Sequence, residues 1–172
     1  WFHEASRVGL AMDGVIYSAL ISMSVSKSEG GGLPAAARWF RRAQLEGVES
    51  VILALNTLLN AVAKMGDQAT AEHWFEEAVA AGVVPDVETY GALAAVAARE
   101  NDAAAAERWF EKAVKRGLKP DAALFGTLIS VAVKTGNLLA ARRWLRRTVE
   151  AGVVPSKGPV TAAIRSAAQK GD

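Results

Sequence analysis

The 172-residue sequence contains no cysteine and only two histidines. Without cysteine, the chain forms no disulfide bond, thiolate nucleophile or thiolate metal site. The histidines, His3 and His73, are too far apart in sequence to act as a ligand pair on one helix. We therefore expect neither a metal site nor a cofactor.

Long apolar runs are absent as well. The longest, residues 48–63, is interrupted by a glutamate, a serine and two asparagines, whereas a bilayer-spanning helix needs about 20 apolar residues. We expect no transmembrane segment. Residues 1–4 have neither a basic start nor an apolar stretch, so no targeting peptide is visible. The formal net charge of only +2 does not by itself argue for nucleic-acid binding.

Groups of residues that carry out catalysis are also missing. No pair of carboxylates and no nucleophile with a base occurs at a meaningful spacing. The glycine run at residues 30–32 is not followed by the Gly-Lys-Ser/Thr of a phosphate-binding loop. We expect no enzymatic activity in this region and no small-molecule substrate.

What the sequence does contain is a repeat. Each of its five tryptophans precedes a Phe or Leu, and successive pairs are 38, 35, 35 and 35 residues apart. The pairs are Trp1-Phe2, Trp39-Phe40, Trp74-Phe75, Trp109-Phe110 and Trp144-Leu145. A fixed period of this size is typical of a solenoid, in which each unit buries its apolar face by stacking on its neighbours. The sequence therefore favours a binding scaffold.

Each period has the pattern of two helices. In residues 52–86, a first apolar stripe at helical spacing ends at Gly66-Asp67, a C-cap glycine followed by an N-cap acid. A second stripe contains the Trp-Phe pair and is stopped by Pro85, after which Asp86 can cap the next helix. One unit is thus predicted to be a helical hairpin, and its tryptophan is more easily explained by packing between units than by stacking on a ligand.

The pattern divides the chain into four full units and two partial ones. We expect full units at 14–51, 52–86, 87–121 and 122–156, the second helix of a truncated unit at 1–13, and the first helix of another at 157–172. The first full unit carries a three-residue insertion at 30–32, where the superhelix is expected to deviate. Both ends would expose apolar faces, which predicts further repeats or partners there.

Two segments carry a more specific pattern, GVVPDVETYGAL (Gly82–Leu93) and GLKPDAALFGTL (Gly117–Leu128). Pro-Asp follows a glycine by three and four residues, and an aromatic residue follows the Asp by four. At a 35-residue period this resembles the pentatricopeptide repeat (PPR) family over essentially the whole chain, whereas tetratricopeptide repeats have a period of about 34. The resemblance implies an all-α, right-handed α-solenoid superhelix of stacked antiparallel helical hairpins.

Proteins of this family generally bind single-stranded RNA in mitochondria or plastids such as chloroplasts, one base per unit. The resemblance implies that the residue after the first-helix aromatic reads the base together with the residue after the proline. The corresponding pairs are Ser18 with Val51, Asn56 with Asp86, Gly91 with Asp121, and Gly126 with Ser156. Only the Asn-Asp pair matches a combination that the family commonly uses, one that favours uridine, and the two glycines have no side chain with which to bond a base.

The resemblance assigns two further groups of residues to RNA. Aliphatic residues just inside the first helix wedge the bases, and these positions hold Val15, Leu53, Glu88, Ala123 and Gly158. Glu88 departs from the pattern, because its carboxylate would repel the phosphate backbone. Phosphate contacts fall on three basic residues that recur every 35 residues, Lys64, Arg99 and Lys134. These cations could equally complement the dipole at the helix C-terminus.

Arginines gather on the second helices of the first and last full units. They are Arg38, Arg41, Arg42, Arg142, Arg143, Arg146 and Arg147. Because the second helices form the outer face of such a stack, this set is either a solvated surface or a docking site for an acidic protein, rRNA or another anionic surface.

Two functions remain open. The first is an organellar single-stranded RNA-binding scaffold that acts in RNA processing, stability or translation. The alternative is a protein-protein adaptor or structural subunit of a large organellar complex, such as a ribosome or a photosynthetic or respiratory assembly, with a degenerate RNA code. Gly91, Gly126, Glu88 and the alanine-rich first helix at 92–98 favour the adaptor.

Overall fold

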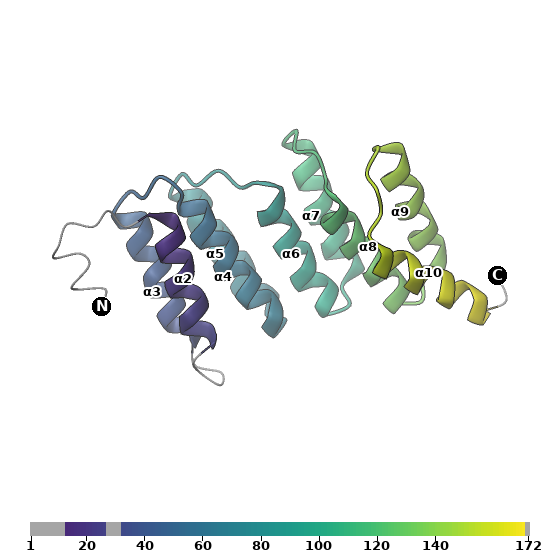
Figure 1. Ribbon diagram of the computed structural model, residues 1–172, viewed down its shortest axis with the longest axis horizontal. Helices are drawn as coiled ribbons and strands as arrows, with labels where there is room; N and C mark the ends of the chain where they lie inside the picture. Colours follow the sequence, from purple (N-terminus) through teal and green to yellow (C-terminus); the bar gives the residue numbers. More distant parts are fainter. Residues whose placement is uncertain (1–12, 27–31, 171–172) are drawn as a thin grey trace.

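The computed structural model describes residues 13–26 and 32–170, and in this part of the chain it has nine helices and no strand (Figure 1). The first helices of the hairpins are α2 (Gly14–Ser26), α4 (Val51–Met65), α6 (Val87–Arg99), α8 (Ala122–Lys134) and α10 (Lys157–Lys170). The second helices are α3 (Gly32–Leu45), α5 (Gln68–Ala80), α7 (Ala103–Lys115) and α9 (Leu138–Glu150). The predicted all-α solenoid of stacked hairpins is confirmed.

Some expectations fall on residues that are not described. The partial unit expected at 1–13 lies outside the described residues except for Asp13, and the insertion at 30–32 lies outside them except for Gly32. In the described part of the chain, no helix is long and apolar enough to cross a bilayer.

Short polar side chains start the helices at the same places in successive units. Each accepts a hydrogen bond from the backbone N–H three residues on, which satisfies one of the free donors of the first turn. These residues are Asp67, Asp86, Asp102, Asp121 and Asn137. The first junction differs, because Ser50 precedes α4 without a side-chain cap and the helix begins at Val51, one residue before the expected unit. That junction lacks the Pro-Asp found later in the chain.

The aromatic pairs of successive second helices join into one ladder. Phe40 packs edge-on against Trp74 at 6.0 Å, and Phe75 packs against Trp109 at 5.2 Å. Phe110 continues the series against Trp144 at 4.9 Å. All three tryptophans are buried, and edge-to-face pairs of this kind add to the stability gained by burial. The ladder therefore packs one unit against the next, which confirms the packing interpretation for Trp74, Trp109 and Trp144.

The first helices form the inner layer of the stack. Each contacts the next one along the chain, from α2 to α4, α6, α8 and α10. Among the described residues, the main chains of successive second helices do not approach each other as closely, and only their side chains meet. Because the first helices are closer together, the stack curves around them, and their exposed faces line its concave side.

Two glycines are required by close packing at the start of this stack. A Cβ atom on Gly14 would overlap the Ser50 carbonyl oxygen just before α4, and one on Gly32 would overlap the Ser24 carbonyl oxygen. The α2–α3 hairpin and the α2–α4 contact are therefore too tight for a side chain at these positions.

Candidate nucleic-acid interface

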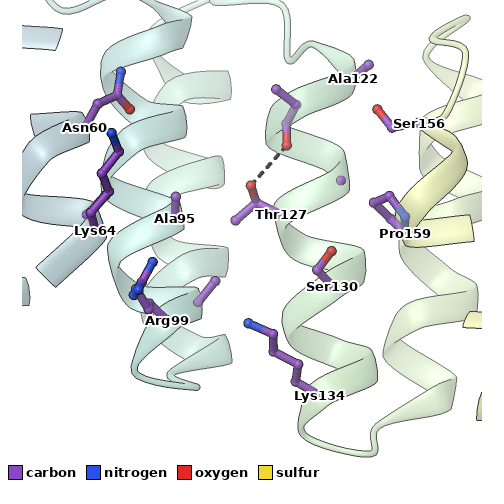
Figure 2. A pocket seen from close by; sticks show the side chains of 14 residues that line it. Asn60, Lys64, Ala95, Arg99, Ala122, Thr127, Ser130, Lys134, Ser156 and Pro159 are labelled. Carbon is purple, nitrogen blue, oxygen red and sulfur yellow. Dashed lines mark hydrogen bonds between the residues drawn. The ribbon is translucent and has the colours of Figure 1, made fainter. Parts of the chain in front are cut away.

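A groove of about 720 Å³ crosses the inner faces of α4, α6 and α8 and reaches the start of α10 (Figure 2). Small residues make up much of its lining, including Ala95, Gly126, Thr127 and Ser130. Their size leaves room for a strand to lie close to the helix backbones. The groove is open to solvent along its length, as expected of a surface that binds an extended polymer rather than a small molecule.

Three cations come together in this groove. Lys64, Arg99 and Lys134 all line it, from the last turns of α4, α6 and α8 (Figure 2). All three side chains are exposed, and none forms an ion pair with any residue that the structure describes. They are therefore available to an anionic ligand. Cations near the C-terminus of a helix also stabilise it by interacting with the helix dipole. Contact with phosphate and stabilisation of the helix are therefore compatible roles for these residues.

The Asn56–Asp86 pair lies at the junction of the second and third full units. The Asn56 amide nitrogen donates to both Asp86 carboxylate oxygens, at 3.2 and 3.4 Å, and its oxygen accepts from the Thr89 hydroxyl at 2.8 Å. Asp86 also accepts from the Thr89 backbone N–H at 2.8 Å and so caps α6. Because a carboxylate only accepts, the NH₂ end of the amide must face Asp86. One N–H and one lone pair of the amide then remain for a base.

Asn56 is also part of the core, since only 2% of its surface is exposed. A base that reads it must therefore reach an amide that is already hydrogen-bonded at both ends. Thr89 was not identified from the sequence. The Asp-x-x-Thr spacing of a capping box is a signal that could have identified its contact with Asp86, but nothing local indicates its bond to Asn56, 33 residues away.

The structure does not join the other three pairs in this way. Ser18 shares a hydrogen bond with Thr57 of α4 rather than with Val51, and Asp121 is exposed and caps α8. The two glycines differ from each other. A Cβ on Gly126 would lie 3.3 Å from Pro159, whereas a Cβ on Gly91 would meet no atom within 4 Å.

The expected base-wedging positions lie on the exposed surface of the first helices. Val15 is 63% exposed and Leu53 is 39% exposed, so both offer apolar surface at which a base could stack. Glu88, at the equivalent position of α6, is exposed and accepts a long hydrogen bond of 3.5 Å from the Asn60 amide. The inner face is thus apolar at the first two units and acidic at the third.

The outer arginines divide into two groups. Arg41 pairs with Glu77 at 2.9 Å and Arg143 pairs with Glu107 at 2.8 Å, and each pair joins neighbouring second helices. Arg42 pairs with Glu46 at 2.8 Å within one unit, and Arg147 stacks over the Trp144 ring at 4.5 Å. Arg41 and Arg143 therefore help to hold neighbouring units together, whereas Arg42 and Arg147 make these contacts within their own units.

The remaining arginines of this set, Arg38, Arg142 and Arg146, are exposed and make no ion pair with the described residues. Only these three are free for docking. The partners of both inter-unit pairs are 36 residues apart, one more than the period: Arg41 with Glu77 and Glu107 with Arg143. This spacing is a sequence signal that could have identified the pairs.

Comparison with known proteins identifies the repeat. The model of the pentatricopeptide repeat domain matches three overlapping stretches of the chain, residues 38–99, 73–135 and 108–157. The chain belongs to the pentatricopeptide repeat family. No curated protein matches the sequence. Among the residues that the structure describes, no group of three or more His, Asp or Glu side chains is placed to hold a metal ion.

Solved structures share the PPR fold. The pentatricopeptide repeat protein PPR10 from maize, in complex with an 18-nt psaJ RNA element, superposes with a TM-score of 0.77 at 20% identity, over 98% of this chain and 24% of PPR10. The PPR domain of Arabidopsis thaliana protein-only RNase P 1, in complex with tRNA, gives 0.69 at 20% identity, over 90% and 82%. Nuclear proteinaceous RNase P 2 from A. thaliana gives 0.66 at 17% identity, over 89% and 35%. The chain thus spans about a quarter of PPR10 and about a third of the nuclear enzyme.

Proposed function

We propose that this PPR chain is a non-catalytic scaffold that binds single-stranded RNA along its concave face. The observation that carries the proposal is the row of Lys64, Arg99 and Lys134 on three successive helices of one groove. Phosphates repeat along a strand, so cations that repeat along a solenoid match them unit by unit. The likeness to PPR structures that contain RNA supports the same ligand.

The Asn56–Asp86 junction gives this scaffold its base preference. The Asp86 carboxylate holds the Asn56 amide in one orientation, with its NH₂ group towards Asp86. The orientation of the amide N–H that is not bonded to Asp86 is therefore fixed as well. A uridine places its O4 acceptor on the Watson–Crick edge, where cytidine has an amino group, and an N–H donor distinguishes the two. Discrimination at this single base is expected to be about 1–3 kcal/mol, as for other side chain–base pairs.

Fluorescence anisotropy with short RNAs tests this function. The chain should bind an oligomer with one uridine more tightly than the same oligomer with cytidine there, and Asn56→Ala should remove the difference. Gln68→Ala, which removes an amide side chain from the outer helix α5 and not from the groove, is the matched control and should keep the preference. Negligible binding of both oligomers by the parent chain would refute RNA binding.

We further propose that the full-length protein works in a mitochondrion or plastid, in RNA processing, stability or translation. The family resemblance supports this subcellular location, although one protein with the same fold, nuclear proteinaceous RNase P 2, is nuclear by name. Microscopy of the full-length protein fused to a fluorescent reporter measures it directly, and an exclusively nuclear signal would contradict it.

The second candidate function is a protein adaptor or structural subunit within a large organellar assembly. It is favoured by three observations: the absence of a reading side chain at Gly91 and Gly126, the burial of Asn56, and the free arginines of the outer face. Affinity purification with and without nuclease separates the two functions. Partners that stay bound after nuclease treatment favour the adaptor, and partners that are lost favour RNA binding.

A further inference from the structure

The inner face of the third full unit lacks a side chain at its centre, where Gly91 stands. Glu88, Gly91, Ala95 and Arg99 follow one another at helical spacing along α6. Gly91 leaves room for a side chain, because a Cβ there would meet no atom within 4 Å. A ligand that lies along the inner face of α6 can therefore approach the helix backbone at this position, which is one turn from the groove-lining Ala95.

Glu88 borders this space. A side chain on a helix points towards the helix N-terminus and covers the turn before its own Cα. A side chain at position 91 would therefore cover the turn that bears Glu88, and because residue 91 is a glycine this surface stays uncovered. The Glu88 side chain is exposed, and its Oε1 accepts from the Asn60 amide of α4 at 3.5 Å. This contact draws the carboxylate towards the junction between α4 and α6 and leaves its other oxygen free.

The equivalent positions of the other units provide no such group. Val15, Leu53 and Ala123 are apolar, and Gly126, the second glycine at a reading position, faces Pro159 rather than open space. The combination of an accessible carboxylate and a missing side chain therefore occurs once among the four full units.

The chemistry of the carboxylate selects among the bases. An ionised carboxylate only accepts hydrogen bonds, and it has two oxygens side by side. Guanine places two adjacent donors, N1–H and N2–H, on its Watson–Crick edge. Adenine, cytosine and uracil place an acceptor next to each donor, so a lone pair would face the second carboxylate oxygen. Two parallel bonds to a charged acceptor are both stronger and more specific than one.

We propose that Glu88 and the space beside Gly91 form a binding site for a guanine base. The inference rests on the proposed function, because the RNA strand in the groove delivers the base. The Glu88 carboxylate repels the phosphates of the RNA strand. Two cations compensate this repulsion, Arg99 at the other end of the same face of α6 and Lys64 of α4. The acidic residue that seemed out of place in an RNA groove then acts as a base-reading group.

Binding of a matched set of RNAs tests the site. Each oligomer carries one uridine, with guanosine, inosine, adenosine or cytidine placed on either side of it. The parent chain should bind the guanosine oligomer about 5- to 150-fold more tightly than the adenosine and cytidine oligomers. The inosine oligomer should fall between them, since inosine keeps N1–H and lacks the N2 amino group.

Two variants should each remove this preference. Glu88→Gln replaces one acceptor by a donor at unchanged size, and Gly91→Leu fills the space while the carboxylate remains. Glu111→Gln, which removes an exposed carboxylate from the outer helix α7, is the control for charge alone and should retain the preference. Matching circular dichroism spectra and melting temperatures establish that all variants are folded.

The outcomes separate the inference from the function on which it rests. If Glu88→Gln tightens binding of all oligomers equally and guanosine is not preferred, the carboxylate only repels RNA and the site is refuted. If the parent chain binds none of the oligomers, RNA binding itself fails. A guanosine preference that survives both variants would place guanine recognition elsewhere in the groove and would also overturn the site.

Discussion

Removal of the groove cations one at a time should reduce the salt dependence of RNA binding by a predictable step. For single-stranded nucleic acid, the logarithm of the affinity falls with the logarithm of salt concentration by about 0.7 per phosphate neutralised. Lys64, Arg99 and Lys134 line one groove and are unpaired with the described residues. Three contacts give a slope of about 2.1, which is an about 18-fold loss of affinity between about 50 and 200 mM salt.

Each alanine substitution should lower that slope by about 0.7, so that Lys134→Ala loses only about sevenfold over the same range. Anisotropy titrations of one uridine-containing oligomer at several potassium chloride concentrations measure the slope. Arg146→Ala is the matched control, because it removes an exposed cation from α9 on the opposite side of the stack.

If Lys134→Ala and Arg146→Ala lower the slope by the same amount, the overall charge of the chain and not the groove governs binding. A slope that none of the three groove substitutions changes would show that the phosphates lie elsewhere.

Three further predictions concern the fold and are measured by urea unfolding. Gly14→Ala should destabilise the chain by more than about 1 kcal/mol, because the new Cβ would overlap the Ser50 carbonyl oxygen. Gly91→Ala should instead stabilise it by about 0.5–1 kcal/mol, because alanine has a higher helix propensity than glycine and its Cβ meets no other atom there. Phe110→Ala should cost about 3–5 kcal/mol, since this residue is 1% exposed and packs against Trp144, and a cost below about 1 kcal/mol would contradict the aromatic ladder. The hydrogen bond from Arg41 lowers the pKa of Glu77 below 4.5, so the pair stabilises the chain above that pH and the contribution is lost as the pH falls through the lowered value. The stability difference between the chain and Arg41→Ala should therefore be largest near neutral pH and shrink in acid, and a difference that grows in acid would be inconsistent with it.

The helices could be predicted from the sequence because their signals are local. Asp86 and Asp121 stand three residues before the N–H groups that they cap, and the αL glycine that closes α4 immediately follows its last residue. The uncapped start of α4 is consistent with this, since the sequence there lacks the Pro-Asp signal. The tryptophan spacing then gave the length of the repeating unit.

The candidate site was predictable in part. The period placed Lys64, Arg99 and Lys134 in register, and the structure brings them into one groove. The period did not indicate that Asn56 is buried, because burial depends on how closely α6 approaches α4. The pairing of Arg41 with Glu77 likewise depends on the angle between units, which no local pattern determines.

The sequence by itself determined the all-α architecture, the length of the unit and the row of cations, because each depends on spacing along one chain. Only the tertiary structure decided what each residue of the inner face can do. Gly91 and Gly126 are the same residue at the same position of successive units, yet one faces open space beside a carboxylate and the other faces a proline ring. The side chains that make this difference come from neighbouring turns and neighbouring units, and their positions are set by packing rather than by sequence order.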